Sequence, residues 1–212
     1  MPDSVESSRK PYVSALRTAA ADAKRERVVA AATQSLRDDG GLAGFSLESV
    51  ARAAGVTRLT VYNQFGSRRG LLEAVFDDIA ARGRLDTIPQ AMSMADPLQG
   101  LDAIIERFCA FWSSDEAIGR LHDAMATDAE FAVALTARNE RRRRLLQALM
   151  KRLLPAEAPS RRRRDAVDFV YAMTSYAMFR LLGANRSVDA VAELVKTSCR
   201  AVLDAAAARR PN

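Results

Sequence analysis

Residues 45–75 read FSLESVARAAGVTRLTVYNQFGSRRGLLEAV and contain two short helical segments joined by a tight turn. Ser46 and Thr57 stand where these segments begin, and hydroxyl side chains there accept hydrogen bonds from the free N–H groups of a helix. Between the segments, residues 54–56 (AGV) supply a small residue, a glycine and an aliphatic residue, which together permit a sharp turn between two packed helices. The spacing predicts a helix-turn-helix between Ser46 and Asn63.

Apolar residues on either side predict two further helices that cover this pair. Upstream, a helix should end at Gly40-Gly41, because glycine favours the left-handed cap of a helix C-terminus. Downstream, Gly66-Ser67 opens a helix with apolar side chains at helical spacing. These inward-facing positions are Val28, Val29, Ala32 and Leu36 upstream, and Leu71, Leu72, Val75, Phe76 and Ile79 downstream.

Composition extends the helical prediction to the whole chain. The 212 residues include only seven prolines and ten glycines, and few windows alternate apolar with polar residues. We therefore expect an all-α protein in three parts: a flexible arm over residues 1–20, a helix-turn-helix domain over 21–84, and a helical domain over 85–212.

The most apolar stretch, residues 166–182, is interrupted by Asp168 and Arg180, so we expect a buried helix and no membrane contact. No export signal is visible at the N-terminus. Cys109 and Cys199 should be reduced thiols, and we expect the cytoplasm as the compartment.

Two predicted helices near the C-terminus, about 160–182 and from Ser187 onward, each carry a long apolar face. Such faces at the end of a chain favour pairing with a second copy, so we expect a homodimer held by both helices. Met178 and Val195 represent the two faces in this prediction. The positions assigned to the faces are Val167, Val170, Tyr171, Thr174, Met178, Leu181 and Leu182, then Val188, Val191, Val195, Cys199 and Val202.

Positive charge is concentrated in the helix-turn-helix. The formal net charge is +6, and residues 49–72 hold four arginines and no acidic residue. The second helix exposes a mixed set of side chains while Val61 and Phe65 face the core, and such a set is typical of contact with the edges of bases. Arg58 can bind a guanine edge, and Leu59 can touch a thymine methyl. The predicted DNA-binding residues of this helix are Thr57, Arg58, Leu59, Thr60, Tyr62, Asn63 and Gln64.

The quoted stretch, with flanks from about residue 30 to about residue 79, resembles the TetR family of bacterial regulators. The resemblance implies that Ser46, Thr60 and Tyr62 bind phosphate and that Arg68, where a lysine is usual, makes a further phosphate contact. Position 59 is commonly small in the family, and Arg69 stands where glutamate is frequent. The rest of the chain is similar to the family only in length and helicity.

Large adaptable side chains in the C-terminal part could either form an ordinary core or line a cavity for an effector. The resemblance favours a cavity, because central helices in the family commonly enclose the effector. The candidate ligand-binding residues are Phe108, Phe111, Trp112, His122, Met125, Met173 and Tyr176. The arginine runs 141–144 and 161–164 are interpreted as solvated helix faces, since four consecutive residues point all round a helix.

No cofactor or metal site is predicted, since His122 is the only histidine. No catalytic constellation is visible, so an enzyme is the weakest of three hypotheses. The leading hypothesis is a dimeric repressor that binds a palindromic operator in double-stranded DNA and is released by a small apolar or aromatic ligand. The alternative is a DNA-binding regulator without such an effector, either an activator or a regulator controlled by a protein partner.

Overall fold

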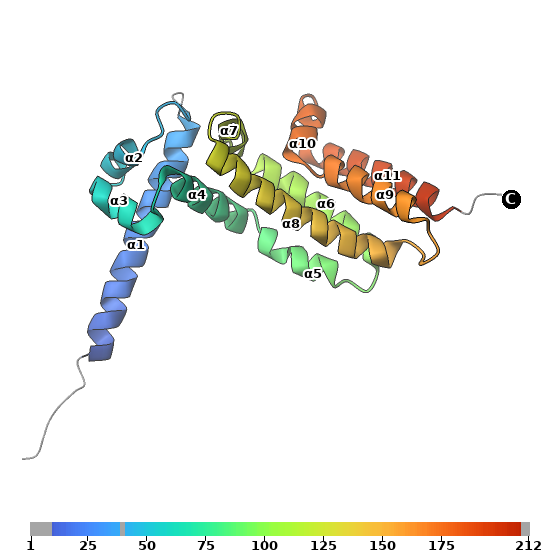
Figure 1. Ribbon diagram of the computed structural model, residues 1–212, viewed down its shortest axis with the longest axis horizontal. Helices are drawn as coiled ribbons and strands as arrows, with labels where there is room; N and C mark the ends of the chain where they lie inside the picture. Colours follow the sequence, from blue (N-terminus) through green and yellow to red (C-terminus); the bar gives the residue numbers. More distant parts are fainter. Residues whose placement is uncertain (1–9, 39–40, 209–212) are drawn as a thin grey trace, which may run out of the picture. The chain divides into compact units, whose positions relative to one another are not determined.

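The computed structural model describes residues 10–38 and 41–208, and all its regular elements in these ranges are helical (Figure 1). The predicted all-α class is confirmed. The chain divides into two compact units, residues 1–75 and 76–212, so the division falls nine residues before the predicted boundary at residue 84. None of the described helices is long and apolar enough to cross a membrane.

The N-terminal unit is built from α1 (Lys10–Arg37), α2 (Leu47–Ala53), α3 (Arg58–Phe65) and the first part of α4 (Arg68–Arg82). Its core consists of the predicted apolar residues, among which Val28, Leu36, Val50, Val61 and Leu71 are fully buried. Amphipathic helices of this length hold together because each buries one face against the others.

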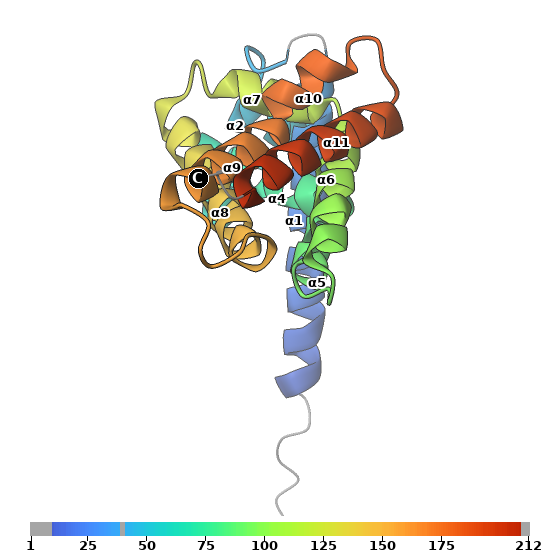
Figure 2. The ribbon, with the colours of Figure 1, turned by 90° about the vertical axis from the view of Figure 1, so that its right-hand side faces the viewer.

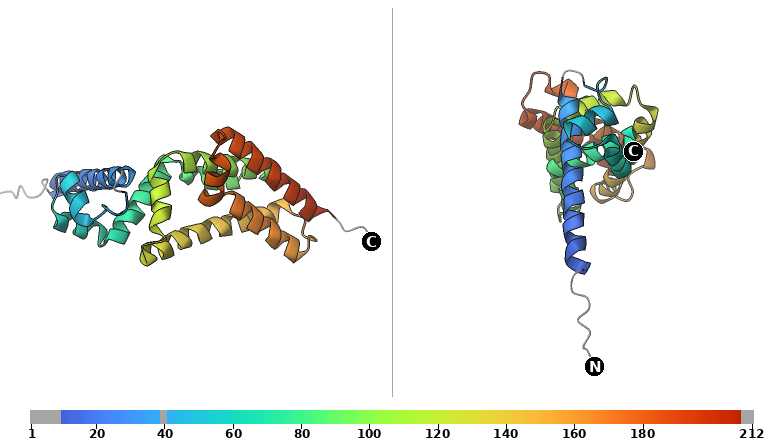
Figure 3. Two further views of the ribbon diagram at one scale, coloured as in Figure 1. Left: turned by 90° about the horizontal axis from the view of Figure 1, so that it is seen from above. Right: turned by 90° about the vertical axis from the view of Figure 1, so that its left-hand side faces the viewer.

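The N-terminal half of α1 differs from the prediction. The helix begins at Lys10, so the arm expected over residues 1–20 is helical from Lys10 onward, while residues 1–9 lie outside the described residues. Residues 17–27 are exposed and extend past α2 and α3 (Figures 1 and 3). The helix ends at Arg37, earlier than the predicted stop; Gly40 is outside the described residues, and Gly41 has a positive φ of 44°.

The C-terminal unit begins within α4 and continues through a short 3-10 turn, Leu85–Thr87, and α5 (Ile88–Met92). Two long helices, α6 (Pro97–Ser113) and α8 (Ala129–Leu153), lie side by side with α7 (Ala117–Ala124) between them in the chain (Figures 1 and 2). The last three helices are α9 (Ser160–Met173), α10 (Tyr176–Gly183) and α11 (Val188–Ala207). Asp96 caps α6 and Pro97 occupies its first turn, as Pro commonly does.

The single helix predicted over 160–182 is two helices. α9 stops at Met173, and α10 starts after Ser175, whose hydroxyl accepts a hydrogen bond from the Met178 N–H at 3.2 Å. Serine and threonine side chains compete with the helix for backbone partners, and here Thr174 and Ser175 both bond to carbonyls of the preceding turn. Because the helix is interrupted here, the backbone carbonyl of Thr174 is directed toward α6 and α8, where it accepts hydrogen bonds from side chains.

The apolar faces that predicted a dimer lie largely inside the subunit. α11 packs on α6 and α9, and this packing buries Val167, Val170, Val191, Val195 and Cys199. The predicted assignment of these residues to an intersubunit surface is therefore wrong. An amphipathic pattern shows that a face is buried, but it does not show which partner buries it.

Candidate nucleic-acid interface and effector site

The turn between α2 and α3 has the geometry that the sequence predicts. Ser46 caps α2, accepting the Ser49 N–H at 3.0 Å, and Thr57 caps α3, accepting the Thr60 N–H at 3.1 Å. Gly55 has a φ of +64°, a conformation that costs an L residue roughly 1–2 kcal/mol. This turn fixes the direction of α3, so its side chains are presented by a rigid support.

α3 separates its residues into two faces. Val61 and Phe65 face the core, at 0% and 9% exposure. Leu59 and Tyr62 are 66% and 56% exposed, so α3 presents two large side chains on its outward face. The outward side chains come from the predicted DNA-binding set: Thr57, Arg58, Leu59, Tyr62 and Asn63 are exposed, as is Ser46 at the start of α2, and Thr60 is half-buried.

Arg68 is more constrained than a free phosphate contact would be. Its Nε donates to the Phe45 carbonyl at 3.2 Å, one terminal nitrogen donates to the Leu42 carbonyl at 3.4 Å, and its guanidinium carbon lies 5.5 Å from the Phe45 ring centroid. Arg68 therefore ties α4 to the loop before α2. Its neighbour Arg69 forms an ion pair with Glu73 at 3.1 Å.

Gln64 is the one member of the predicted α3 set that lies against α1. It is half-buried, its Oε1 is enclosed without a hydrogen-bond partner, and its backbone carbonyl accepts from Arg25 at 3.2 Å. Arg25 was not predicted to contribute. Its guanidinium carbon also lies 4.5 Å from the Phe65 ring centroid, so it fastens α1 to the end of α3. No local pattern in the sequence distinguishes Arg25 from its basic neighbours.

In the C-terminal unit, the predicted aromatic residues form one cluster around Trp112. The centroid of its ring lies 4.6 Å from Phe111, 6.0 Å from Phe108, 5.6 Å from His122 and 5.7 Å from Tyr176. The His122 and Tyr176 rings are 4.3 Å apart. Burial lowers the pKa of His122, because the charged imidazolium loses hydration. The other two predicted ligand-binding residues, Met125 and Met173, are half-buried.

A residue that the sequence analysis placed on a solvated face lies inside this region. Arg142 on α8 is 7% exposed, and its guanidinium carbon is 4.5 Å from the Tyr171 centroid and 5.5 Å from the Phe108 centroid. It donates to the Thr174 carbonyl at 2.5 Å, and the same oxygen accepts from the Trp112 indole at 3.0 Å. For Arg142 the predicted solvated face is wrong, because one of four consecutive helical residues must point inward.

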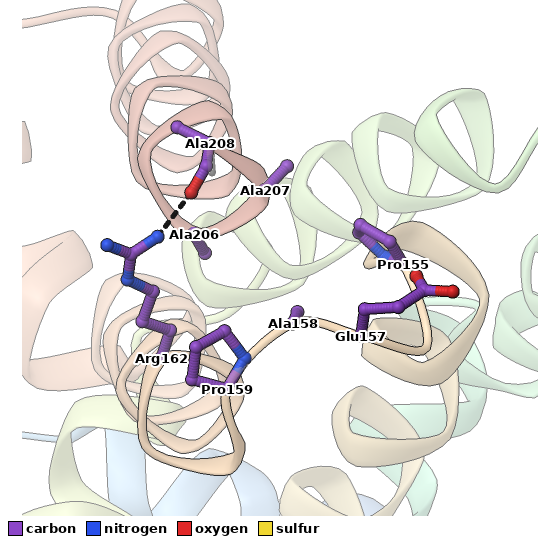
Figure 4. Close-up of a pocket in the computed structure, with 8 residues that line it drawn as sticks. All are labelled: Pro155, Glu157, Ala158, Pro159, Arg162, Ala206, Ala207 and Ala208. Atoms are coloured by element: carbon purple, nitrogen blue, oxygen red, sulfur yellow. Dashed lines mark hydrogen bonds between the residues drawn. The ribbon is translucent and has the colours of Figure 1, made fainter. Parts of the chain in front are cut away.

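Two grooves lie on the surface of this unit. The first, of about 350 Å³, runs between the loop after α8 and the end of α11 (Figure 4). It is lined by Pro155, Glu157, Ala158, Pro159, Arg162, Ala206, Ala207 and Ala208. The second, of about 470 Å³, lies between α8 and α9 and brings members of both arginine runs together. None of the predicted ligand-binding residues lines either groove.

The remaining polar groups of the described residues offer no metal centre. Residues 10–38 and 41–208 contain no group of three or more His, Cys, Asp or Glu side chains able to hold a metal. Burial raises the pKa of Cys109 to about 11 and that of Cys199 to about 12, which disfavours the reactive thiolate.

The molecule has two capped helices joined by a glycine turn, the second of them exposed, and a further helical unit. This combination is typical of helix-turn-helix regulators. Residues 29–75 match the model of the family described as bacterial regulatory proteins, tetR family. The helix-turn-helix domain of the chain belongs to the TetR family of transcriptional regulators, as the sequence resemblance implied. This family consists of regulators and not of enzymes, in agreement with the expectation that the chain is not an enzyme.

Individual relatives agree with this assignment. The chain is 32% identical over 116 residues to the HTH-type transcriptional regulator BetI of Vibrio vulnificus, a match that covers 46% of this chain and 59% of that protein. Among solved structures, the fold is similar to NalD, the secondary repressor of the MexAB-OprM multidrug efflux pump in Pseudomonas aeruginosa. The TM-score is 0.65 at 21% identity over 85% of this chain and 95% of NalD. A transcriptional regulator from Rhodococcus sp. Rha1 gives 0.65 at 17% identity, over 87% and 98% of the two chains.

Proposed function

We propose that the chain is a repressor that binds a palindromic operator as a homodimer and releases it when a small molecule binds the C-terminal unit. The observation that carries the DNA-binding part is the outward face of α3, where Leu59 and Tyr62 are exposed on a helix whose direction Gly55 fixes. Arg58 at the start of α3 would read a guanine edge, while Ser46, Thr60 and Tyr62 would hold phosphates.

The cost of leaving Leu59 and Tyr62 in water is explained if DNA covers them. Thr57, Asn63 and Gln64 border this face, and Arg68 at the start of α4 would add a phosphate contact. We therefore expect two classes of contact. Arg58 and Leu59 would discriminate between sequences, and Arg68 would strengthen binding to every sequence.

A second copy would pair through the outer face of α11 and not through the buried one. Leu194 is 38% exposed, and Leu181 on the neighbouring α10 is 70% exposed. On α11, Leu194 belongs to a strip of small or apolar residues at helical spacing, none of which is buried in the single chain. The strip consists of Ala190, Leu194, Thr197, Ala201 and Ala205. Small residues allow helices to approach closely, which suits a four-helix interface between two subunits.

The direct test is operator binding. The purified protein should retard DNA from its own promoter region, and the affinity should fall steeply as salt rises, because neutralised phosphates release counterions. Arg58→Ala should weaken binding to the operator by about 1–3 kcal/mol and leave nonspecific binding nearly unchanged. Failure to bind any fragment of its own locus would reject the proposal. Operator DNA lies in the cytoplasm of a bacterium, so we expect the chain there.

The effector part of the proposal rests on the cluster of Phe108, Phe111, Trp112, His122 and Tyr176. The half-buried Met125 and Met173 are further candidates. NalD, which has a similar fold, is the secondary repressor of an efflux pump. A ligand can release a repressor from DNA only if it binds the DNA-free conformation more tightly than the DNA-bound conformation. A ligand for this chain should raise its melting temperature and weaken operator binding over the same concentration range. Control by a protein partner is the alternative if no small molecule does both.

A further inference from the structure

Arg142 is a buried cation whose charge no carboxylate of the described residues neutralises. Arg138 and Arg143 on the same helix pair with Asp77 and Asp168, whereas no described acidic side chain forms an ion pair with Arg142. Its Nε is enclosed and has no hydrogen-bond partner. Arginine is almost never this deeply buried without a counter-charge, because the lost hydration costs several kcal/mol by general estimates.

The groups that do surround Arg142 offset only part of this cost. The Thr174 carbonyl accepts one N–H, and the faces of Phe108 and Tyr171 supply cation–π contacts. The Thr174 oxygen is shared with the Trp112 indole, so it is not available to Arg142 alone. Burial lowers the pKa of Arg142 by more than the interaction with Tyr171 raises it, so its surroundings disfavour the charged form.

Next to this cation lie flat aromatic walls. Trp112 contacts Phe108, Phe111, His122 and Tyr176, and the Arg142 charge contributes, after burial, to the lowered pKa of His122. The Arg142 guanidinium thus places a positive charge beside an apolar aromatic lining. The chemical complement is a molecule with a flat apolar body and one anionic group, since guanidinium donates paired N–H bonds to a carboxylate.

α10 offers a route to this region. It contains no buried residue, although its Tyr176 ring covers His122 and Trp112. The Tyr176 hydroxyl lies directly over Gly119, where a Cβ would approach it to 2.7 Å. Elements with few buried side chains open at low free-energy cost, so α10 can move away while α6 and α8 keep Trp112 and Arg142 in place.

We infer that the effector is an aromatic or similarly flat carboxylate, whose anionic group pairs with Arg142 while its apolar body packs against Trp112. This inference rests on the proposed effector site and names the chemical class that the site selects. The acid supplies the counter-charge that the protein lacks, and its binding restores hydrogen bonds to the enclosed Nε.

The test compares acids with their primary amides, which match in shape and differ in charge. Benzoate, phenylacetate and 2-naphthoate are titrated into the full-length protein by calorimetry at neutral pH, each beside its amide. At least one acid should bind, and it should bind at least tenfold more tightly than its amide. The inference is overturned if none of the acids binds, or if acid and amide bind equally well.

Two substitutions in α8 test whether Arg142 is the residue that causes the preference for the acid over its amide. Arg142→Met should remove the preference for the acid, whereas Arg138→Met, which removes a carboxylate-paired arginine one turn away, should retain it. An unchanged preference in Arg142→Met would overturn the inference. If Arg142→Met does not fold, the comparison of acid and amide on the unmodified protein still decides.

Calorimetry is done without DNA, so the result does not depend on operator binding. Acid-selective binding by a protein that retards no DNA would reject the proposed function and retain the assignment of the ligand. A protein that binds its operator but shows no acid preference would retain the proposed function and overturn the assignment of the ligand.

Discussion

Val195 and Leu194 are neighbours in α11 but point to different sides of the helix, one toward the core of the subunit and the other toward its proposed assembly surface. Val195 is 1% exposed in the single chain and packs within the subunit, while Leu194 is 38% exposed on the outer face. Val195→Ala and Leu194→Asp should therefore affect different properties. The first should lower the stability of the fold, and the second should dissociate the dimer.

The size of the first effect follows from burial. Val195→Ala removes two buried methyl groups at about 0.8 kcal/mol each and leaves a small cavity, so the free energy of unfolding should fall by roughly 2–3 kcal/mol. For chains of this length each kcal/mol corresponds to about 2–4 °C, which gives a decrease in Tm of roughly 4–12 °C. The dimer should persist, because no atom of the outer face changes.

Leu194→Asp should cost the isolated subunit less than about 1 kcal/mol, because the site is partly exposed to water. In the dimer, however, the new carboxylate would lose its hydration against an apolar partner surface. Sedimentation velocity at micromolar concentration should show the unmodified protein and Val195→Ala as dimers and Leu194→Asp as a folded monomer. The assignment is refuted if Val195→Ala dissociates the dimer without lowering Tm, or if Leu194→Asp unfolds the chain.

Tyr62→Phe should weaken operator binding about tenfold or more through the loss of one hydrogen bond to phosphate, with Tm unchanged because the side chain is exposed; an unchanged affinity would show that Tyr62 is not a donor. Arg68→Met should lower the free energy of unfolding by about 1–3 kcal/mol, since two carbonyls lose a donor, and chemical denaturation measures it. If only DNA binding falls, the role of Arg68 in the loop is minor. Cys109 and Cys199, with pKa values raised to about 11 and 12, should react with a thiol reagent at pH 8 only after unfolding, and rapid labelling of the native protein would contradict their burial. The pKa of His122 is lower in the fold than its ordinary value of 6.5, so below that pH the unfolded chain binds more protons than the folded chain. Tm should therefore decrease as pH falls from about 7 to about 5. The decrease in Tm per pH unit should be smaller in His122→Gln.

The helix-turn-helix could be predicted from sequence because its determinants are local. Ser46 and Thr57 mark the starts of their helices by capping chemistry, and Gly55 marks a turn that requires a positive φ. Each of these effects acts within a few residues of chain, so a linear pattern contains it. The outward position of Leu59 follows from the same periodicity once Val61 is placed in the core.

The destination of Arg142 could not be predicted in the same way. Among four consecutive arginines in a helix, at least one points toward the body of the helix bundle. How deeply that arginine is buried depends on Thr174 and Tyr171, which lie later in the chain. Thr174 is 32 positions away from Arg142. Likewise, the apolar pattern around Val195 predicts burial correctly, yet the partner is α6 of the same chain. The pattern has no information about which chain supplies the covering surface.

The break between α9 and α10 has an evolutionary consequence. The atom on which Trp112 and Arg142 converge is a backbone oxygen, and every residue type supplies one at position 174. Exchange of the Thr174 side chain alone leaves this acceptor present, so an alanine substitution at position 174 would not by itself reveal the junction of α6, α8 and α9. What must be inherited is the interruption of the helix, and sequences that differ at this position can keep the junction as long as the chain still turns there.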